Sequence, residues 1–171
     1  WGSGILAYGD GLLLDLGREL VCYDAFLTER WHAQLREGAW APDFYEMRLD
    51  EVSEILYLYA YDRVLSFDLK RQRIRAERKL ADGESCFLHG VLPGVGAVML
   101  VGDSTIQVWD ADLKLISRHR AKGGITRFLH QDGKTFLLTC VWPQNDFRET
   151  KDGYDFVCLR NGCLRLYELK K

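Results

Sequence analysis

Cysteine and histidine are the residues whose spacing comes closest to that of a metal site. Cys86 and His89 have the C-x-x-H spacing of two zinc ligands, and His130 with Cys140 could complete a set of four. Both cysteines lie in apolar, strand-like runs, where a reduced thiol packs as a small hydrophobic side chain. The sequence has no phosphate-binding glycine loop, HExxH pair or nucleophile elbow. We therefore expect no metal, no cofactor and no catalytic residues, and favour a binding protein over an enzyme.

Two aromatic segments are stronger candidates for function. "WAPDFYE" begins at Trp40 and "WPQNDF" begins at Trp142; each has a proline within two residues and continues to an acid and an aromatic. Large aromatic side chains anchor interfaces because they bury much area at little cost in side-chain entropy. The alternative is that each tryptophan folds back and fills the end of a sheet. The sequence predicts a protein-binding surface made by Trp40, Asp43, Tyr45, Trp142, Asp146 and Phe147.

Four strand-turn-strand units recur along the chain and would position these segments. Their first strands are 11–16, 55–60, 97–102 and 155–160, and their second strands are 19–24, 63–68, 105–110 and 163–168. Every second strand ends in an aromatic residue and an acid: Tyr23-Asp24, Phe67-Asp68, Trp109-Asp110 and Tyr167-Glu168. The first two intervals between these aromatics match the length of a β-propeller blade, about 40 to 45 residues.

Additional strands flank most of these hairpins. Short apolar runs precede them at 5–8, 44–49 and 86–91, and charged strands follow three of them at 28–35, 71–80 and 112–120. Four strands per unit is the number in a propeller blade. Consecutive apolar residues at 12–14 and 98–101 indicate strands that are covered on both faces, as they are when blades stack. A charged outermost strand suits an exposed sheet edge, where Arg and Lys discourage unwanted pairing.

The sequence resembles the WD-repeat family of β-propellers. The resemblance rests on "VWD" at 108–110, on its three analogues, and on "ITRFLHQDGKTFLLTC" at 125–140, which is similar to the inner strand, turn and second strand of a blade. It implies an all-β domain over 1–171, a β-propeller-like array of about four antiparallel blades with repeats at 1–38, 39–83, 84–124 and 125–171. Function would then reside in loops on a rigid scaffold. The alternative fold is an antiparallel β-sandwich or barrel.

The fourth repeat has two interpretations. In the first, 134–142 is a second strand, Pro143 to Gly153 is an inserted loop, and the C-terminal residues form the outermost strand. In the second, 155–168 is the central hairpin and 125–142 is an additional hairpin. Asn161-Gly162 is a strong signal for a two-residue hairpin, because both residues tolerate the positive φ of a type I′ turn, but the sequence leaves both interpretations open. The second interpretation leaves the outer strand to the N-terminus or to a larger assembly.

Charge and composition limit the partners. The net charge of −2 gives no general attraction to nucleic acid or to an anionic membrane, and edge protection accounts for the basic run at 71–79. The longest apolar runs fall well short of the roughly 20 residues that span a bilayer. Five cysteines, an odd number, favour a reducing compartment. We expect a soluble, cytoplasmic protein that binds another protein, and neither a membrane nor nucleic acid.

Two further hypotheses remain open at this stage. One is a small enzyme or ligand-binding protein with polar residues around a central channel, where propellers commonly place such sites. The other is a homo-oligomer, or one part of a larger propeller assembly, because four units could form a small ring or contribute part of a bigger one.

Overall fold

The structure is a computed structural model that describes residues 4–35, 46–60, 62–81, 86–102, 105–120, 124–131, 134–141, 144–150, 153–160 and 163–169. Beyond residue 120 it describes the backbone of the strands and a few side chains. All regular elements in these ranges are β-strands, which agrees with the predicted all-β class.

Three four-stranded antiparallel sheets follow one another along the chain. The first sheet comprises β1 (Ile5–Tyr8), β2 (Gly11–Asp15), β3 (Glu19–Tyr23) and β4 (Glu29–Gln34). The second sheet comprises β5 (Glu46–Asp50), β6 (Ile55–Ala60), β7 (Arg63–Asp68) and β8 (Arg73–Lys79). The third sheet comprises β9 (Cys86–Leu92), β10 (Gly96–Val101), β11 (Thr105–Trp109) and β12 (Leu115–Arg120). Each sheet is a meander, so the predicted flanking strands and central hairpins are confirmed here.

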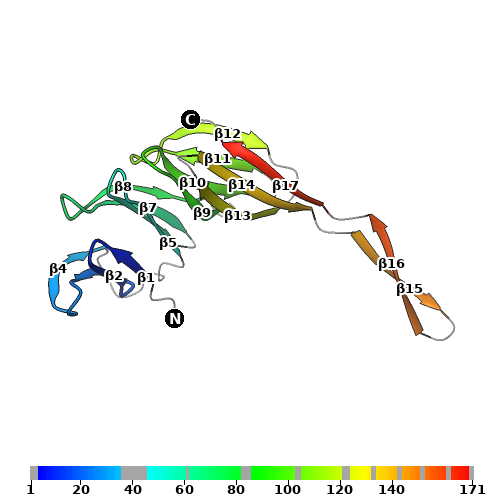
Figure 1. Cartoon of the computed structure of the whole chain (residues 1–171), viewed down its shortest axis with the longest axis horizontal. Helices are drawn as coiled ribbons and strands as arrows, with labels where there is room; N and C mark the ends of the chain where they lie inside the picture. Colours follow the sequence, from blue (N-terminus) through cyan, green and yellow to red (C-terminus); the bar gives the residue numbers. More distant parts are fainter. Residues whose placement is uncertain are drawn as a thin grey trace.

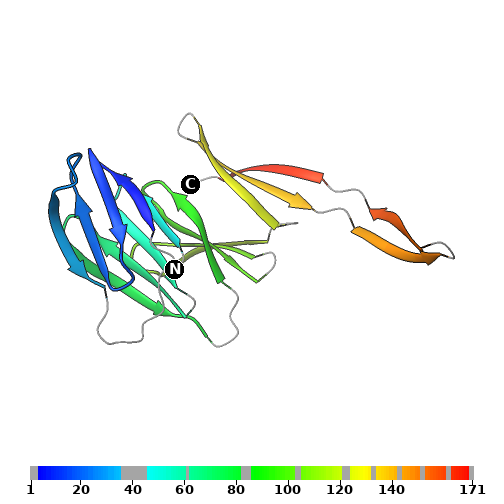
Figure 2. The same cartoon turned by 90° about the horizontal axis from the view of Figure 1, so that it is seen from below.

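The C-terminal part forms a fourth sheet and a separate hairpin. The fourth sheet comprises β13 (Gly124–Gln131), β14 (Lys134–Val141) and β17 (Cys163–Leu169), in that order. Between β14 and β17 the chain makes a two-stranded hairpin of β15 (Gln144–Thr150) and β16 (Gly153–Arg160). Figures 1 and 2 show the sheets fanned side by side in sequence order, with this hairpin projecting away from them.

Two predictions about the fourth repeat are wrong. The segment predicted as an inserted loop is mostly strand, and β16 pairs with β15 instead of with β17. Asn161-Gly162 therefore does not close a hairpin between the strands on either side of it. β17 instead pairs with β14 over seven residue pairs, from Thr135↔Leu169 to Val141↔Cys163. The pairing of β17 with the apolar strand β14, which packs on the third sheet, outweighs the preference of Asn-Gly for a hairpin turn.

Each pair of neighbouring sheets encloses its own hydrophobic core. Leu13 and Cys22 of the first sheet pack with Leu58 and Phe67 of the second, and Leu20 lies in the same core. The other face of the second sheet packs on the third, and a smaller core joins the third sheet to the fourth. All six residues of β6 are buried for this reason. Separate sheets, of which the second and the third pack on a neighbour with both faces, exclude a single barrel or a two-layer sandwich for the described part of the chain.

The repeated aromatic residue fills the interface with the preceding sheet. Phe67 and Trp109 are 0% exposed. The ring of Trp31, on β4 of the first sheet, stacks on Phe67 with a centroid distance of 6.1 Å. The guanidinium of Arg78, on β8 of the second sheet, lies 4.1 Å from the centroid of Trp109. In both interfaces the outermost strand of one sheet supplies a planar or cationic group to the aromatic of the next.

The repeated acid fixes the turn that follows the third strand. Oδ1 of Asp24 accepts hydrogen bonds from the backbone N–H groups of Phe26 (2.9 Å) and Thr28 (2.8 Å). Asp110 accepts the equivalent pair from Asp112 and Lys114, both at 2.9 Å. The third residue after each acid, Leu27 or Leu113, has a positive φ, of 61° and 58°. An aspartate that bonds the backbone ahead of it holds such a turn without help from glycine.

Glycine is needed where the second strand begins. Gly11 and Gly96 occupy this place in the first and third sheets. A Cβ at either position would collide with a backbone carbonyl oxygen, that of Tyr23 or that of Trp109. The backbone of the second strand therefore passes very close to the carbonyl group of the aromatic residue on the third strand. Only glycine, which has no Cβ, allows this approach.

Candidate protein-interaction surface

The structure describes the position of two of the six predicted binding residues. Trp40, Asp43, Tyr45 and Trp142 lie outside the described residues. Asp146 and Phe147 are on β15, where the register places them opposite Val157 and Phe156. β15 belongs to the hairpin that projects from the sheets (Figure 1). The binding set stays a prediction, with two of its members on an element that stands apart from the packed cores.

The turn after β3 carries an exposed apolar pair that the sequence analysis did not single out. Phe26 is 90% exposed and Leu27 is 68% exposed. The Asp24 hydrogen bonds described above hold this turn in place, so both side chains are presented on a defined backbone. The signal in the sequence is the comparison of "DAFLT" at 24–28 with "DADLK" at 110–114, where the same turn has a charged residue in place of Phe26.

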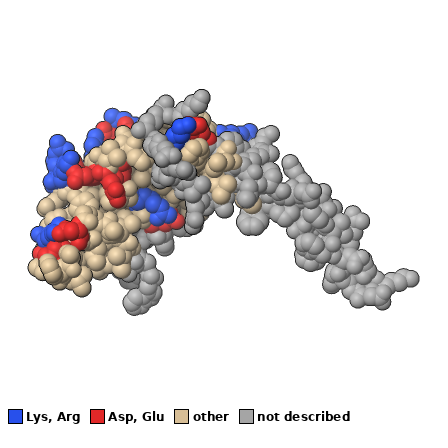
Figure 3. All heavy atoms as spheres, viewed as in Figure 1, with Lys and Arg blue, Asp and Glu red and all other residues tan. Residues whose placement is uncertain are grey.

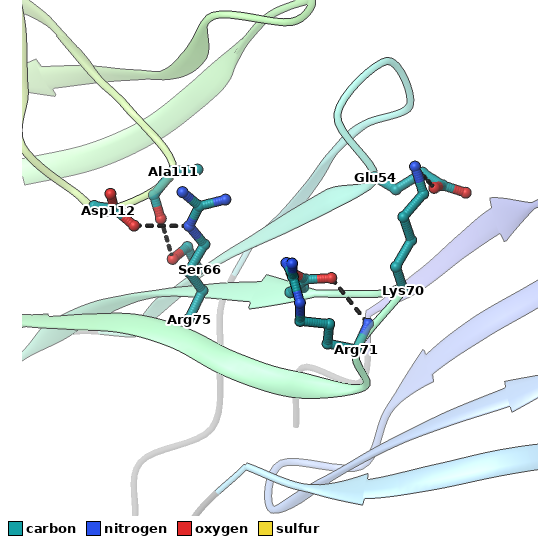
Figure 4. A network of polar contacts seen from close by, with 8 residues as sticks. Glu54, Ser66, Lys70, Arg71, Arg75, Ala111 and Asp112 are labelled. Atoms are coloured by element: carbon teal, nitrogen blue, oxygen red, sulfur yellow. Dashed lines mark hydrogen bonds and ion pairs between the residues drawn. The ribbon is translucent and has the colours of Figure 1, made fainter.

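The corresponding turn of the third sheet makes polar contacts with the second sheet (Figure 4). Nε of Arg75, on β8, donates to Oδ1 of Asp112 in the turn of the third sheet at 2.7 Å. The buried Ser66 hydroxyl donates to the carbonyl oxygen of Ala111 in the same turn at 2.6 Å. The Arg75 hydrogen bond, with its positive charge, lowers the pKa of Asp112. These bonds join two sheets at one edge of the stack.

A second polar link lies between the second and third sheets. Asp50, at the end of β5, is 1% exposed, and both of its carboxylate oxygens accept from the backbone N–H of Gly94, at 3.0 and 2.9 Å. The same carboxylate accepts from the N–H of Val52 and the hydroxyl of Ser53. One buried acid therefore organises the turn after β5 and attaches it to the turn after β9.

The innermost strands of successive sheets lie next to one another. β1 adjoins β5, β5 adjoins β9, and β9 adjoins β13. The described polar side chains on these strands include Glu46, Arg48 and His89. Arg48 donates to the carbonyl of Met47 at 2.8 Å and to Glu46 at 3.4 Å. Burial raises the pKa of Glu46; burial and the charge of Arg48 lower that of His89.

Arg48 and Glu46 form an ion pair, with 3.4 Å between Nη2 and Oε2. Among the described residues there is no group of three or more His, Cys, Asp or Glu side chains that could hold a metal. Cys86, one of the residues considered as a zinc ligand, is fully buried in the core between the second and third sheets.

Charged side chains of both signs lie on the face of the molecule that Figure 3 shows, where Lys and Arg are interspersed with Asp and Glu among the described residues. Several are paired, among them Arg30 with Asp10 at 2.7 Å and Arg63 with Asp62 at 2.7 Å and with Glu77 at 2.6 Å. In the described ranges, no helix has the length and hydropathy needed to cross a membrane.

Comparison with known proteins identifies the fold. No family model matches the sequence, and neither does any curated protein. Solved structures do match. The WD40 domain of Pan2 from Neurospora crassa aligns with 96% of the chain at a TM-score of 0.58 and 11% identity. The WD40 domain of SCAP from fission yeast aligns with 98% at 0.55 and 12% identity, and BamB from Moraxella catarrhalis with 78% at 0.57 and 11% identity. The fold is a β-propeller-like array of blades.

The likeness confirms the predicted propeller resemblance, and each stacked sheet is one blade. WD40 domains are generally protein-interaction scaffolds. The chain covers 48% of the Pan2 domain, 44% of the SCAP domain and 38% of BamB, and so spans less than half the length of each of these structures.

Proposed function

We propose that the protein is a non-enzymatic scaffold that binds another protein. The observation that supports this best is the contrast between the packed sheets and the β15–β16 hairpin. Buried side chains of the stacked sheets pack in the cores between the sheets, while the β15–β16 hairpin projects away from the stack (Figure 2). An extended hairpin can offer both side chains and an unpaired strand edge to a partner.

The binding residues in this proposal are Trp40, Asp43, Tyr45, Trp142, Asp146 and Phe147. Aromatic residues at such positions would serve as anchors, and the acids would orient a partner through charge-assisted hydrogen bonds. The four repeats 1–38, 39–83, 84–124 and 125–171 form the scaffold that carries them. Burial of the Cys22 and Cys86 thiols fits a reducing compartment, and we place the protein in the cytoplasm.

Site-specific photo-crosslinking in the cell tests this proposal. A photoreactive amino acid at Phe147 should give a discrete crosslinked band, because the hairpin contacts the partner. The same amino acid at Val52, which is 70% exposed in the turn between β5 and β6, serves as the control. The same band from both positions, or no band at Phe147, would contradict the assignment of the binding surface to the hairpin.

Alanine variants of the two tryptophans separate binding from folding. Trp40→Ala and Trp142→Ala should abolish capture of the crosslinked partner while the thermal unfolding midpoint stays within a few degrees of the unmodified protein. A collapse of that midpoint would instead show that the tryptophans fill the ends of sheets, which was the alternative interpretation of these residues.

A further inference from the structure

The outermost strand of the third sheet, β12, is the most exposed of the three equivalent strands β4, β8 and β12. Each of these strands ends the order of its sheet, and no described strand pairs with its other edge. Five of the six residues of β12 are exposed, against four of six in β4 and four of seven in β8. Figure 1 shows β12 along the rim of the stack. The free backbone groups of such an edge can pair with a further strand.

The charge of β12 also differs from that of the other two outer strands. β4 and β8 each contain an acid that pairs with a neighbouring cation: Glu29 with His32 at 2.8 Å, and Glu77 with Arg63 at 2.6 Å. β12 has the sequence LISRHR, which contains no acid. Among the described residues, its two arginines have no ion-pair partner. An edge of this kind opposes pairing with a basic strand and favours pairing with an acidic one.

The two arginines of β12 lie on the face of the third sheet that is turned toward the second sheet. Arg118 pairs with Gln107, and Arg120 pairs with Thr105. Residues directly opposite one another in a sheet lie on the same face. Gln107 accepts a hydrogen bond from the indole N–H of Trp109 at 2.9 Å, and Trp109 lies in the core shared with the second sheet. Arg118 and Arg120 therefore border the space between the outer strands of these two sheets.

The second sheet adds a third cation on this side. The guanidinium of Arg78 on β8 lies 4.1 Å from the centroid of the same indole ring. The register of β7 and β8 places Val64, Ser66 and Ala76 on the face of Arg78, and none of them carries a charge. Glu77 pairs with a leucine of the core shared with the first sheet, so it lies on the opposite face. The positive charges between β8 and β12 are therefore not offset by an acid of these strands.

The beginning of β12 is apolar. Leu115 and Ile116 are its first two residues, and they are 48% and 51% exposed. Asp112, in the turn before them, is paired with Arg75 at 2.7 Å. Along its length β12 therefore presents an exposed apolar pair, followed by exposed arginines, on a strand whose outer edge is free.

We propose that β12 binds an acidic, extended segment of another protein, which adds to the third sheet as a further strand. Backbone hydrogen bonds to the free edge would hold the segment, and its carboxylates would pair with Arg118 and Arg120. A nucleic acid can neutralise arginines, but it has no peptide groups that pair with a strand edge. This surface is separate from the β15–β16 hairpin, so the two proposals can fail independently.

Fluorescence anisotropy with a labelled peptide of alternating valine and glutamate tests the charge requirement. The peptide should bind, and the matched peptide with glutamine in place of glutamate should bind at least about tenfold more weakly. Arg118→Glu should raise the dissociation constant of the acidic peptide at least about fivefold. Arg73→Glu makes the same change of charge at an exposed position of β8 and should change this constant less than about twofold.

Four results of this experiment would overturn the proposal. They are no binding of the acidic peptide, equal binding of the two peptides, equal effects of the two variants, and tighter binding of an oligothymidine of matched charge. The last result would assign the arginines to nucleic acid.

Hydrogen exchange distinguishes strand addition from attraction between charges alone. The bound acidic peptide should slow amide exchange in β12 at least about tenfold and leave β4 unchanged, because an added strand bonds the free N–H groups of the edge. Unchanged exchange in β12 with the peptide bound would overturn the strand pairing. In the Arg118→Glu protein, β11 should keep its protection from exchange, which separates lost binding from lost folding.

Discussion

At the scale of single residues, the aromatic and the acid that end the third strands have separate roles. Phe67 and Trp109 fill the space between two sheets, whereas Asp24 and Asp110 hold turns by accepting backbone hydrogen bonds. The pattern of the pair is visible in the sequence. The tasks are not, because they depend on partners such as Trp31 and Arg78, which come from a different repeat.

Removal of the interface aromatic should be strongly destabilising. Phe67→Ala should lower the free energy of unfolding by about 3–5 kcal/mol, because it opens a cavity beneath Trp31. Phe26→Ala is the matched control: this side chain is 90% exposed, and its loss should change the free energy by no more than about 0.5 kcal/mol. Denaturant unfolding measures both. Similar losses for the two variants would contradict the packing described for Phe67.

Loss of the turn aspartate should have a smaller but clear effect. Asp110→Ala removes an acceptor for two backbone N–H groups, and we expect a loss of about 1–2 kcal/mol in the free energy of unfolding. Asp10→Ala removes only the exposed ion pair with Arg30, which is worth about 0–1 kcal/mol. An Asp110 variant as stable as the Asp10 variant would show that the turn forms without its acid.

At the scale of elements, sequence reasoning succeeded where the signal is local. β1 has the bounds of the predicted run 5–8, and the charged strands β4, β8 and β12 lie within the predicted ranges. Alternation of apolar and polar residues indicates a strand with one covered face, and a continuous apolar run indicates a strand with both faces covered. The same reasoning failed for β16 and β17, because their pairing depends on β14 and β15, and a local Asn-Gly signal carries no information about a strand farther along the chain.

The predicted binding site was located less well by sequence reasoning than the strands were. Asp146 and Phe147 were assigned to a loop and lie on β15, while the exposed Phe26 was not singled out. Exposure of an aromatic in a short turn is set by the backbone conformation that Asp24 imposes, and composition alone does not reveal it. Four of the six predicted binding residues lie outside the described ranges, so their role stays a prediction.

The buried carboxylate between two elements gives an element-scale prediction. Asp50→Ala removes a buried carboxylate that accepts from the backbone N–H groups of Gly94 and Val52, and it should lower the free energy of unfolding by about 2–3 kcal/mol. Ser53→Ala removes a single hydroxyl bond to the same acid and should cost about 1 kcal/mol. If the two variants unfold at the same denaturant concentration, the Asp50–Gly94 link does not connect the second and third sheets as described.

The inner-strand histidine predicts a pH dependence. The unfolded chain protonates His89 below about pH 6.5. In the folded protein burial, with the charge of Arg48, lowers its pKa, so the unfolded state binds more protons as the pH falls below that value. The contribution of His89 to stability is therefore complete above pH 6.5 and declines with acidification. His89→Gln should flatten the fall in unfolding midpoint between about pH 7.5 and 5.5.

His32 is the control of opposite sign. Its hydrogen bond to Glu29 raises its pKa, so its contribution is present below about pH 6.5 and is lost as the pH rises through the folded value. His32→Gln should make the acid fall of the unfolding midpoint steeper. Flattening by the His32 variant, or no change with the His89 variant, would contradict the surroundings assigned to these two rings.

At the scale of the whole molecule, stability comes from contacts between neighbouring sheets. Each blade is a meander that cannot bury both of its apolar faces by itself, so the stack gains stability by addition of neighbours, as in other repeat proteins. The hairpin, the loops and the free edges of the outer strands are what remains for recognition. This is the physical basis for proposing a scaffold with partners at those places.

The measurement that tests this account most directly is a set of nuclear Overhauser effects between methyl and aromatic protons of neighbouring sheets in solution. Stacked sheets predict cross-peaks from Trp31 to Phe67 across the first interface, and from Leu137 to Val108 across the third. Cross-peaks that instead connect the first sheet to the fourth within one copy, or that place Trp31 far from Phe67, would contradict the sequential stacking of blades.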